Sequence, residues 1–276
     1  MTALRAPTVD EEVAPLRVST PLVDVMTVTC DMPRSGLTPA HHVHRTWIGV
    51  PTSGLFRIHA RGDEHLVHPA VGVVFPAGDE YRMTHPVDGG DTGVALTFRD
   101  DVTEEALAGR VERVRTTGLD VRVRHGVALL LAALRRRDAT RVEELALQLL
   151  RSVSRDVATD PPARSSAARA KVDRVRLLLA ERPEERWTLE RLARRVGWSP
   201  YHLAHQFRLY TGATVHRYLE ELRVAAALRR IEAGDASLAA LAVELGFSHH
   251  SHMTARLRRR LGVTPRAIRE QLSARR

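Results

Sequence analysis

Short apolar runs separated by turn-forming residues fill most of the first hundred positions of the chain. Residues 1–20 form a lead without a clear structural pattern, and apolar runs rich in β-branched and aromatic residues follow it at 22–29, 55–59, 66–68, 71–75 and 93–98. Stretches of Gly, Pro, Asp and Ser separate these runs at 51–54, 61–64, 76–79 and 88–91. Short strands with frequent turns are typical of an all-β sandwich or barrel, so we predict a β domain here.

The spacing of apolar residues changes after about residue 100. Apolar positions at helical spacing predict helices over residues 103–117, 121–137 and 140–157. The second and third of these helices have strongly apolar faces, which would pack on the barrel or on a second chain. We expect them to serve as dimerisation helices.

Residues 158–168 contain Pro161 and Pro162 and no large apolar residue, which predicts an interdomain linker. The pattern therefore divides the chain into a flexible lead (1–20), a first domain (21–157), this linker and a second, helical domain (169–276). Within the second domain, helices are predicted over residues 170–181 and 215–233.

An internal repeat marks the second domain. The segment TLERLARRVGWS at 188–199 returns as SLAALAVELGFS at 237–248, an offset of 49 residues. Beyond it the offset is 50, because one residue is inserted in the second copy. The positions matched at this offset are Leu203, Phe207, Gly212 and Thr214 with Met253, Leu257, Gly262 and Thr264.

Each copy of the repeat has the features of two short helices joined by a tight turn. Thr188 or Ser237 would cap the first helix, and a glycine (Gly197 or Gly246) would end it in the left-handed conformation. Ser199 or Ser248 would then cap the second helix. This is the helix–turn–helix pattern, whose second helix lies in the major groove of DNA. Two copies about 50 residues apart predict a DNA-binding domain.

The distribution of charge agrees with that prediction. The chain carries 42 basic and 33 acidic residues, a formal net charge of +9. Residues 165–276 hold 22 basic and 11 acidic residues, whereas residues 1–164 hold 20 and 22. Codon bias in a GC-rich genome explains why 41 of the basic residues are Arg. It does not explain why the excess is confined to the part with the repeat, which indicates a polyanionic partner.

Residues from about 170 to 272 resemble the DNA-binding domain of the AraC/XylS family of transcriptional regulators. The resemblance is carried by Leu189, Leu192, Ala193, Gly197, Ser199, Leu203, Phe207, Gly212, Tyr218, Leu219, Arg223, Leu241, Ala242, Gly246, Phe247, Ser251, Gly262, Val263, Thr264, Pro265 and Arg269. Met253, Leu257 and Ile268 stand where the family usually has aromatic residues, and all three keep the position apolar.

The resemblance implies which residues contact DNA. The positions facing the bases are Tyr201, Ala204 and His205 in the first unit and His250, Ser251, Thr254 and Ala255 in the second. Arginines further along the second helices suit phosphates, and these are Arg208, Arg256, Arg258, Arg259 and Arg260. The alternative is that these polar residues only face solvent.

The first domain resembles small cupin barrels in the form that senses ligands in AraC-type regulators. Gly36 followed by His42 and His44 fits the first cupin motif, although its glutamate is missing. Residues 72–81 fit the second motif loosely, with Tyr81 where a metal-binding histidine would stand. We therefore expect a pocket for a small organic molecule, lined by His42, His44, Trp47, Phe56, Phe75, Tyr81 and His85.

A metal site formed by His42, His44 and His85 is the alternative use of these histidines. We expect no metal and no other cofactor, because the usual acidic and third histidine ligands are absent. The sequence contains no nucleophile triad, phosphate loop or CxxC motif, so we expect no catalytic residues and no enzyme. The single cysteine, Cys30, excludes an internal disulfide and an all-cysteine zinc site.

These observations predict a multidomain α+β protein. A cupin-like β-barrel with dimerisation helices precedes an all-α domain of two helix–turn–helix units. The predicted function is sequence-specific transcriptional regulation in response to a small molecule. A cupin-type metalloenzyme fused to a DNA-binding domain, and a constitutive regulator with a structural barrel, are the alternatives.

The expected partners are double-stranded promoter DNA, a small-molecule effector and a second copy of the chain, with RNA polymerase as a further candidate. The longest apolar run, at residues 127–134, is far shorter than the roughly 20 residues of a membrane helix. We therefore expect a cytoplasmic protein without membrane contact.

Overall fold

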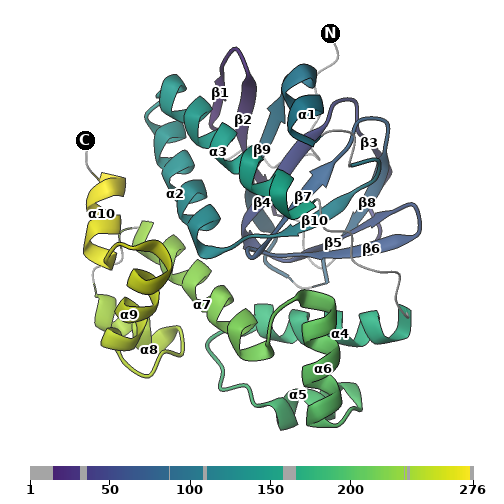
Figure 1. Cartoon of the computed structure of the whole chain (residues 1–276), viewed down its shortest axis with the longest axis vertical. Helices are drawn as coiled ribbons and strands as arrows, with labels where there is room; N and C mark the ends of the chain where they lie inside the picture. Colours follow the sequence, from purple (N-terminus) through teal and green to yellow (C-terminus); the bar gives the residue numbers. More distant parts are fainter. Residues whose placement is uncertain are drawn as a thin grey trace. The chain divides into compact units, whose positions relative to one another are not determined.

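A computed structural model of the chain describes residues 15–31, 36–86, 88–107, 111–157, 166–232, 234 and 237–273. The chain forms two compact units. The N-terminal unit comprises Met1–Leu119 and Gly126–Thr159, and the C-terminal unit comprises Asp120–His125 and Asp160–Arg276. The α+β class predicted from the sequence is confirmed, because the first unit is built on β-sheets and the second is helical (Figure 1).

The N-terminal unit is built on a six-stranded antiparallel sheet. Its order is β1 (Arg17–Ser19), β2 (Val23–Cys30), β9 (Asp91–Phe98), β4 (Trp47–Gly54), β7 (Val71–Phe75) and β10 (Arg115–Gly118). β2 and β9 pair without a break from Val23 opposite Phe98 to Cys30 opposite Asp91. All five residues of β7 are buried, as expected of a continuous apolar run at the centre of a domain.

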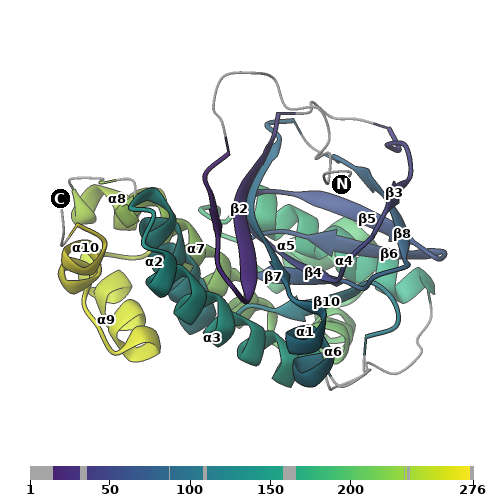
Figure 2. The ribbon, with the colours of Figure 1, turned by 90° about the horizontal axis from the view of Figure 1, so that it is seen from above.

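A second, four-stranded sheet contributes the opposite side of the interior. Its order is β3 (His41–His42), β8 (Glu80–Thr84), β5 (Phe56–Ala60) and β6 (Asp63–Val67). One core cluster joins residues of both sheets, including Ile58 and Val67 from one and Val73 and Phe75 from the other. The described strands therefore form a β fold of two sheets rather than the closed barrel that the sequence predicted (Figure 2).

Three helices accompany the sheets: α1 (Asp100–Leu107), α2 (Val121–Arg135) and α3 (Ala139–Val157). The bounds of α2 and α3 agree with the predicted helices within two residues. The predicted helix over residues 103–117 is wrong at its C-terminal end, because β10 at Arg115–Gly118 is a strand that pairs with β7. Pairing with a buried strand overrides the local helical spacing there.

The predicted apolar face of α3 packs within its own chain. α3 contacts β10, β2, β1 and α1, and its apolar residues Val142, Leu145, Leu149 and Val153 are buried. Of the two roles left open for this face, packing on the barrel is therefore the one observed. Dimerisation through these helices stays a prediction.

The C-terminal unit consists of seven helices among its described residues. They are α4 (Ser166–Glu181), α5 (Leu189–Val196), α6 (Pro200–Thr211), α7 (Val215–Glu232), α8 (Leu238–Glu244), α9 (His250–Leu261) and α10 (Pro265–Ser273). α7 contacts helices of both repeat copies, α6 on one side and α8 and α9 on the other. It therefore joins the two halves of the unit.

The predicted linker at 158–168 lies mostly outside the described residues, and its last three positions form the first turn of α4. Within the described parts of the chain, no helix is long and apolar enough to span a membrane. Met253, Leu257 and Ile268 are fully buried in one core cluster with residues of α7 and α8, so their apolar character is retained in the core.

Candidate nucleic-acid interface and sensor domain

The first repeat copy has the capping geometry that its sequence predicts. The Thr188 hydroxyl accepts a hydrogen bond from the Arg191 amide at 3.1 Å and begins α5. Gly197 ends this helix with φ of 65°, in the left-handed region that favours glycine. Ser199 then accepts from the His202 amide at 3.2 Å and begins α6. Two short helices joined by a tight, capped turn form a helix–turn–helix unit.

The second copy repeats this arrangement with one difference. Ser237 caps α8, and Gly246 in the turn has φ of 75°. The predicted cap at Ser248 is wrong, because His249 is the N-cap of α9 and its Nδ1 accepts from the His252 amide at 3.2 Å. The inserted residue explains the shift, since an offset of 50 from Ser199 leads to His249. The Ser248 hydroxyl instead pairs with His252 Nδ1 at 3.0 Å.

The second helices of both units present most of the predicted base-reading residues to solvent. The exposed ones are Tyr201, His205, His250, Ser251 and Ala255. Tyr201 is 84% exposed, an unusual state for a large aromatic side chain. These positions lie in the first two turns of α6 and α9, the N-terminal part of a recognition helix that contacts base edges.

Two of the predicted base-reading residues are less accessible to a DNA base. Ala204 and Thr254 are half-buried. The Thr254 hydroxyl is shielded from solvent and has no hydrogen-bond partner within the described parts of the chain. Reading a base through Thr254 would therefore require this side chain to turn outward.

The predicted phosphate-binding arginines fall into two groups. Arg208 and Arg258 are exposed. Arg256 and Arg259 instead pair with Glu220 of α7, at 3.3 and 3.5 Å, and Arg260 pairs with Glu221 at 3.2 Å. Glu220 and Glu221 were not among the predicted site residues, although an acidic pair in a basic domain is a signal. The three paired arginines fasten α9 to the connecting helix.

A second ionic contact involves the segment Asp120–His125, which groups with the C-terminal unit. The buried guanidinium of Arg124 donates to the Glu221 carboxylate, so Glu221 receives two arginines. Burial lowers the pKa of Arg124, while the nearby Glu221 charge opposes that shift. A half-buried carboxylate between two guanidinium groups depends on both charges to offset its partial loss of hydration.

The aromatic residues predicted to line a sensor pocket lie together in the N-terminal unit. The Trp47 and Phe75 rings stack at 4.0 Å between centroids, and Tyr81 contacts Phe75 at 4.6 Å. Phe56 packs against the same core cluster. Burial raises the pKa of the Tyr81 hydroxyl to about 12. The four side chains are therefore brought together, but largely by packing on one another.

A shallow hollow adjoins this aromatic group. It has a volume of about 450 Å³ and is lined by residues 59–62 and 78–82, with Tyr81 as its only member from the predicted pocket. Asp79 is buried at its edge and pairs with Arg61 at 2.8 Å. The guanidinium of Arg61, held by Asp79, and the Tyr81 ring are the groups of this hollow that a small molecule could contact.

The predicted pocket histidines do not gather around one point. His42 and His44 are exposed, and His42 pairs with Glu80 at 3.3 Å. His42 lies opposite Glu80 in the strand register. His85 follows five residues after Glu80, which is about 16 Å along an extended chain. The strand register therefore separates His85 from the other two histidines.

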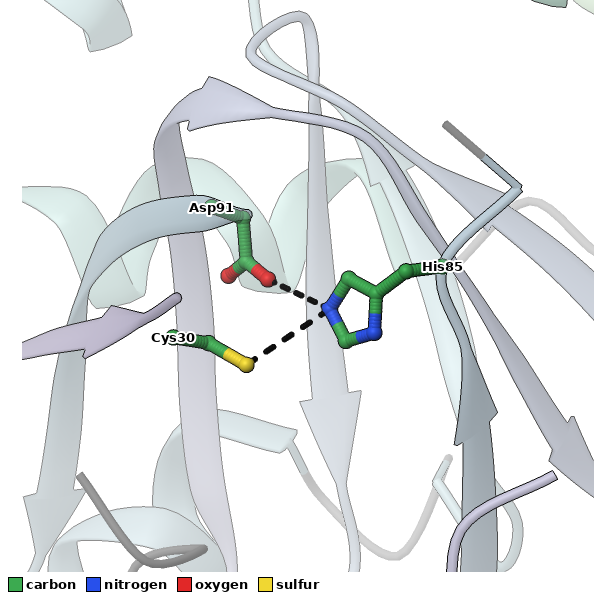
Figure 3. A group of neighbouring side chains, drawn as sticks. All are labelled: Cys30, His85 and Asp91. Carbon is green, nitrogen blue, oxygen red and sulfur yellow. Dashed lines mark hydrogen bonds and ion pairs between the residues drawn. The ribbon is translucent and has the colours of Figure 1, made fainter. Parts of the chain in front are cut away.

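His85 belongs to a different cluster, which sequence reasoning missed (Figure 3). Its ring is fully buried, and Nε2 lies 2.8 Å from Asp91 Oδ2 and 3.7 Å from Cys30 Sγ. The hydrogen bonds to Asp91 and Cys30 raise the pKa of His85 to about 9, against the opposing effect of burial. No spacing in the sequence links these three residues, because the sheet alone brings them together.

Comparison with known proteins identifies the C-terminal unit. A family model described as "Helix-turn-helix domain" matches residues 192–271. The C-terminal unit therefore contains a helix–turn–helix domain, and the chain is similar to transcriptional regulators that carry one. The resemblance expected from the repeat is thereby confirmed.

Several curated helix–turn–helix transcriptional regulators are similar to this chain. The transcriptional activator RhaR of Klebsiella pneumoniae is 29% identical over 59% of this chain and 58% of its own length. The uncharacterized regulator YbfI of Bacillus subtilis is 29% identical over 77% of this chain and 80% of its own. The activator RhaS of Pectobacterium carotovorum is 34% identical over 26% of each chain. The chain thus spans a little more than half of the RhaR relative.

Solved structures give weaker matches. The DNA-binding domain of AdpA in complex with a target DNA is 31% identical over 38% of this chain and 96% of that one, with a TM-score of 0.37. Apo ToxT of Vibrio cholerae is 9% identical over 90% of this chain and 97% of that one, with a TM-score of 0.39. The likeness to helix–turn–helix regulators is carried by sequence similarity and by the capped repeat.

Proposed function

We propose that this protein is an AraC-family regulator that binds specific sequences in promoter DNA through α6 and α9 and regulates transcription. The observation that carries the proposal is the repeat of one capped helix–turn–helix unit in a basic domain, with the same face of the second helix exposed in both copies. Its target is genomic DNA, so the proposed place of action is the cytoplasm. RNA polymerase and a second copy of the chain are proposed partners.

Within this function, base reading falls to the exposed residues at the start of each second helix. His205 and Tyr201 would contact bases in one groove, and His250 and Ser251 in the next. α7 has 18 residues and is about 27 Å long at 1.5 Å per residue. A connector of that length suits recognition helices placed in successive major grooves on one DNA face, about 34 Å apart. We expect a bipartite binding site of roughly 20 base pairs for each chain.

Selection from a pool of random DNA duplexes by the full chain tests this proposal. Sequencing should return two short motifs separated by about one helical turn. His250→Ala should change the preferred bases of one motif by about 1–3 kcal/mol per position and leave the other motif intact. Arg258→Ala should weaken all sequences alike. A pool that shows no enrichment at low salt would overturn the assignment of DNA binding.

We further propose that the N-terminal unit senses a small organic molecule at the hollow beside Tyr81. The support is its polar edge, formed by Asp79 and Arg61 next to the aromatic group. A thermal-shift screen of small metabolites against the full chain should find a compound whose effect is lost in Arg61→Ala. Arg99→Ala, which removes an exposed arginine that does not line this hollow, is the matched control.

The tight packing of Trp47 on Phe75 favours the alternative of a constitutive regulator with a structural barrel. The same screen separates the two functions, because a structural barrel would show no compound with a saturable effect. For both alternatives we propose a regulator without enzymatic activity. The names of the relatives also describe regulators.

A further inference from the structure

Cys30, His85 and Asp91 come from three segments that the sheets bring to one place. Cys30 ends β2 and lies directly opposite Asp91, the first residue of β9. Side chains of directly opposed residues project from the same face of an antiparallel pair. His85 follows the end of β8 in the other sheet. The cluster therefore links both sheets at one end of the N-terminal unit (Figure 3).

Two glycines, Gly54 and Gly90, allow the backbone segments around this cluster to lie very close together. A Cβ on Gly90 would lie 2.0 Å from the Cys30 carbonyl oxygen, and a Cβ on Gly54 would lie 2.3 Å from the Gly90 oxygen and 2.5 Å from Asp91 Cα. Both glycines have positive φ, 62° and 80°. The close approach of three backbone segments fixes Cys30 and Asp91 relative to each other. Preorganised side chains of this kind suit a binding site.

The geometry of the three polar atoms differs from that of a catalytic triad. In a triad, the carboxylate and the nucleophile bind opposite nitrogens of the imidazole, so that a proton can move through the ring. Here Asp91 Oδ2 and Cys30 Sγ both approach the same atom, His85 Nε2, at 2.8 and 3.7 Å. All three atoms lie within 4.8 Å of one another. They converge on one point, as the ligands of a metal ion do.

We propose that Cys30 Sγ, His85 Nε2 and Asp91 Oδ2 form a binding site for a divalent transition-metal ion, with Zn²⁺ as the preferred ion. Tetrahedral Zn²⁺ has Zn–S of about 2.3 Å and Zn–N of about 2.0–2.1 Å, which places the S and N ligands about 3.6 Å apart. The observed Sγ–Nε2 distance is 3.7 Å. The Nε2–Oδ2 pair, at 2.8 Å, would open by about half an ångström to reach the spacing of two ligands.

The charges of the site also suit this ion. A thiolate and a carboxylate carry two negative charges, and Zn²⁺ with a neutral imidazole balances them. Cys30 and His85 are buried and Asp91 is 11% exposed at its side chain. Because the site with its ion bound has no net charge, the cost of burying these groups is lower. The ligand set of S, N and O selects Zn²⁺ over Mg²⁺ and Ca²⁺, which prefer oxygen alone.

The experiment uses the full chain, reduced and treated with chelator, and then titrated with Zn²⁺ against a chromophoric chelator. About one equivalent of Zn²⁺ should bind. Cys30→Ser and Asp91→Asn should each weaken binding at least about tenfold. The matched control is the double variant His42→Ala/His44→Ala, which removes two exposed histidines outside the cluster and should bind as the parent does.

Co²⁺ provides a readout that a merely structural cluster would not give. The Co²⁺-loaded chain should show thiolate-to-metal charge-transfer absorption, and this band should be lost in Cys30→Ser while circular dichroism shows the variant to be folded. The absence of a thiolate band in the parent would overturn the proposal. Zn²⁺ binding that disappears with His42 and His44 but persists without Cys30 would overturn it equally.

Discussion

Asp79 shows how a single buried side chain organises the N-terminal unit. Its carboxylate is 2% exposed and accepts hydrogen bonds from Arg61 Nε at 2.8 Å, the Val114 amide at 2.9 Å and the Glu80 amide at 3.1 Å. Burial opposes ionisation, but these donors outweigh it and hold the pKa of Asp79 below its usual range. The ionised carboxylate thus ties three loops together.

Asp79→Ala should lower the free energy of unfolding of the N-terminal unit by about 2–4 kcal/mol, because the buried Val114 amide would lose its acceptor. Urea denaturation followed by Trp47 fluorescence measures this change. Asp101→Ala, which removes an exposed ion pair with Arg99, is the control and should have little effect. Equal effects of the two variants would contradict the role of Asp79.

The lowered pKa of Asp79 predicts that the stability of the N-terminal unit depends on pH. Because the pKa of Asp79 is lowered on folding, its stabilisation is fully present above the unfolded pKa of about 3.9. It is lost as the pH falls through the lower pKa of the folded state. Urea midpoints between pH 3 and 6 should therefore fall less steeply with acid in Asp79→Asn than in the parent. Parallel curves for the two proteins would contradict a pKa of Asp79 that is lowered on folding.

At the scale of elements, Gly246 in the turn of the second helix–turn–helix unit is closely surrounded by other parts of the chain. Gly246 has positive φ, and a Cβ there would lie 2.4 Å from the Glu184 carbonyl oxygen and 2.8 Å from Arg223 Nη2. Arg223 is itself fixed by bonds to the Pro183 and Glu185 carbonyls at 2.6 and 2.9 Å. The turn between α8 and α9 therefore closes directly on the chain segment before α5.

Gly246→Ala should destabilise the C-terminal unit by more than about 2 kcal/mol, since it adds a backbone clash to the cost of a left-handed alanine. Gly262→Ala is a matched control, because Gly262 has similar φ of 77° but open space around the added Cβ. Gly262→Ala should lower the free energy of unfolding by only about 1–2 kcal/mol. Denaturation followed by circular dichroism at a helical wavelength would show whether the two variants differ.

The arginines of α9 provide a second prediction at this scale. Arg258 is exposed, whereas Arg259 pairs with Glu220. Arg258→Ala should reduce the slope of log affinity against log salt by about one, and Arg259→Ala should reduce it by less. Binding of the selected duplex between 50 and 300 mM salt gives both slopes. A larger change in Arg259→Ala would mean that its pair with Glu220 opens on DNA.

At the scale of the whole molecule, the division into two units does not follow chain order. The segment Asp120–His125 groups with the C-terminal unit, although the chain on either side of it groups with the N-terminal unit. Arg124→Ala should therefore lower the stability of the C-terminal unit by about 3–5 kcal/mol, because Glu221 loses a buried partner.

Tryptophan fluorescence can assign that change to a unit. Trp47 lies in the N-terminal unit, and Trp187 and Trp198 lie in the C-terminal unit. Arg124→Ala should shift the unfolding midpoint in a Trp47→Phe background, which reports on the C-terminal unit. A shift seen only in a Trp187→Phe/Trp198→Phe background would place Arg124 energetically with the barrel instead.

The sequence by itself determined the features that depend on neighbours in the chain. Caps such as Thr188 and Ser199, the left-handed Gly197 and the repeat at 188–199 and 237–248 act within a few residues of one another. They were therefore sufficient to predict the helix–turn–helix units and the resemblance to helix–turn–helix regulators. The β class of the first domain followed in the same way from short runs and turns.

Only the tertiary structure decided the features that depend on pairing between distant segments. The register of β2 with β9 places Cys30 beside Asp91, and the end of β8 adds His85. The pairing of β10 with β7 made a strand where local spacing predicted a helix. α7 turned three predicted phosphate ligands toward Glu220 and Glu221. Local periodicity carries no information about such contacts, because their energy depends on which surfaces meet after the chain has folded.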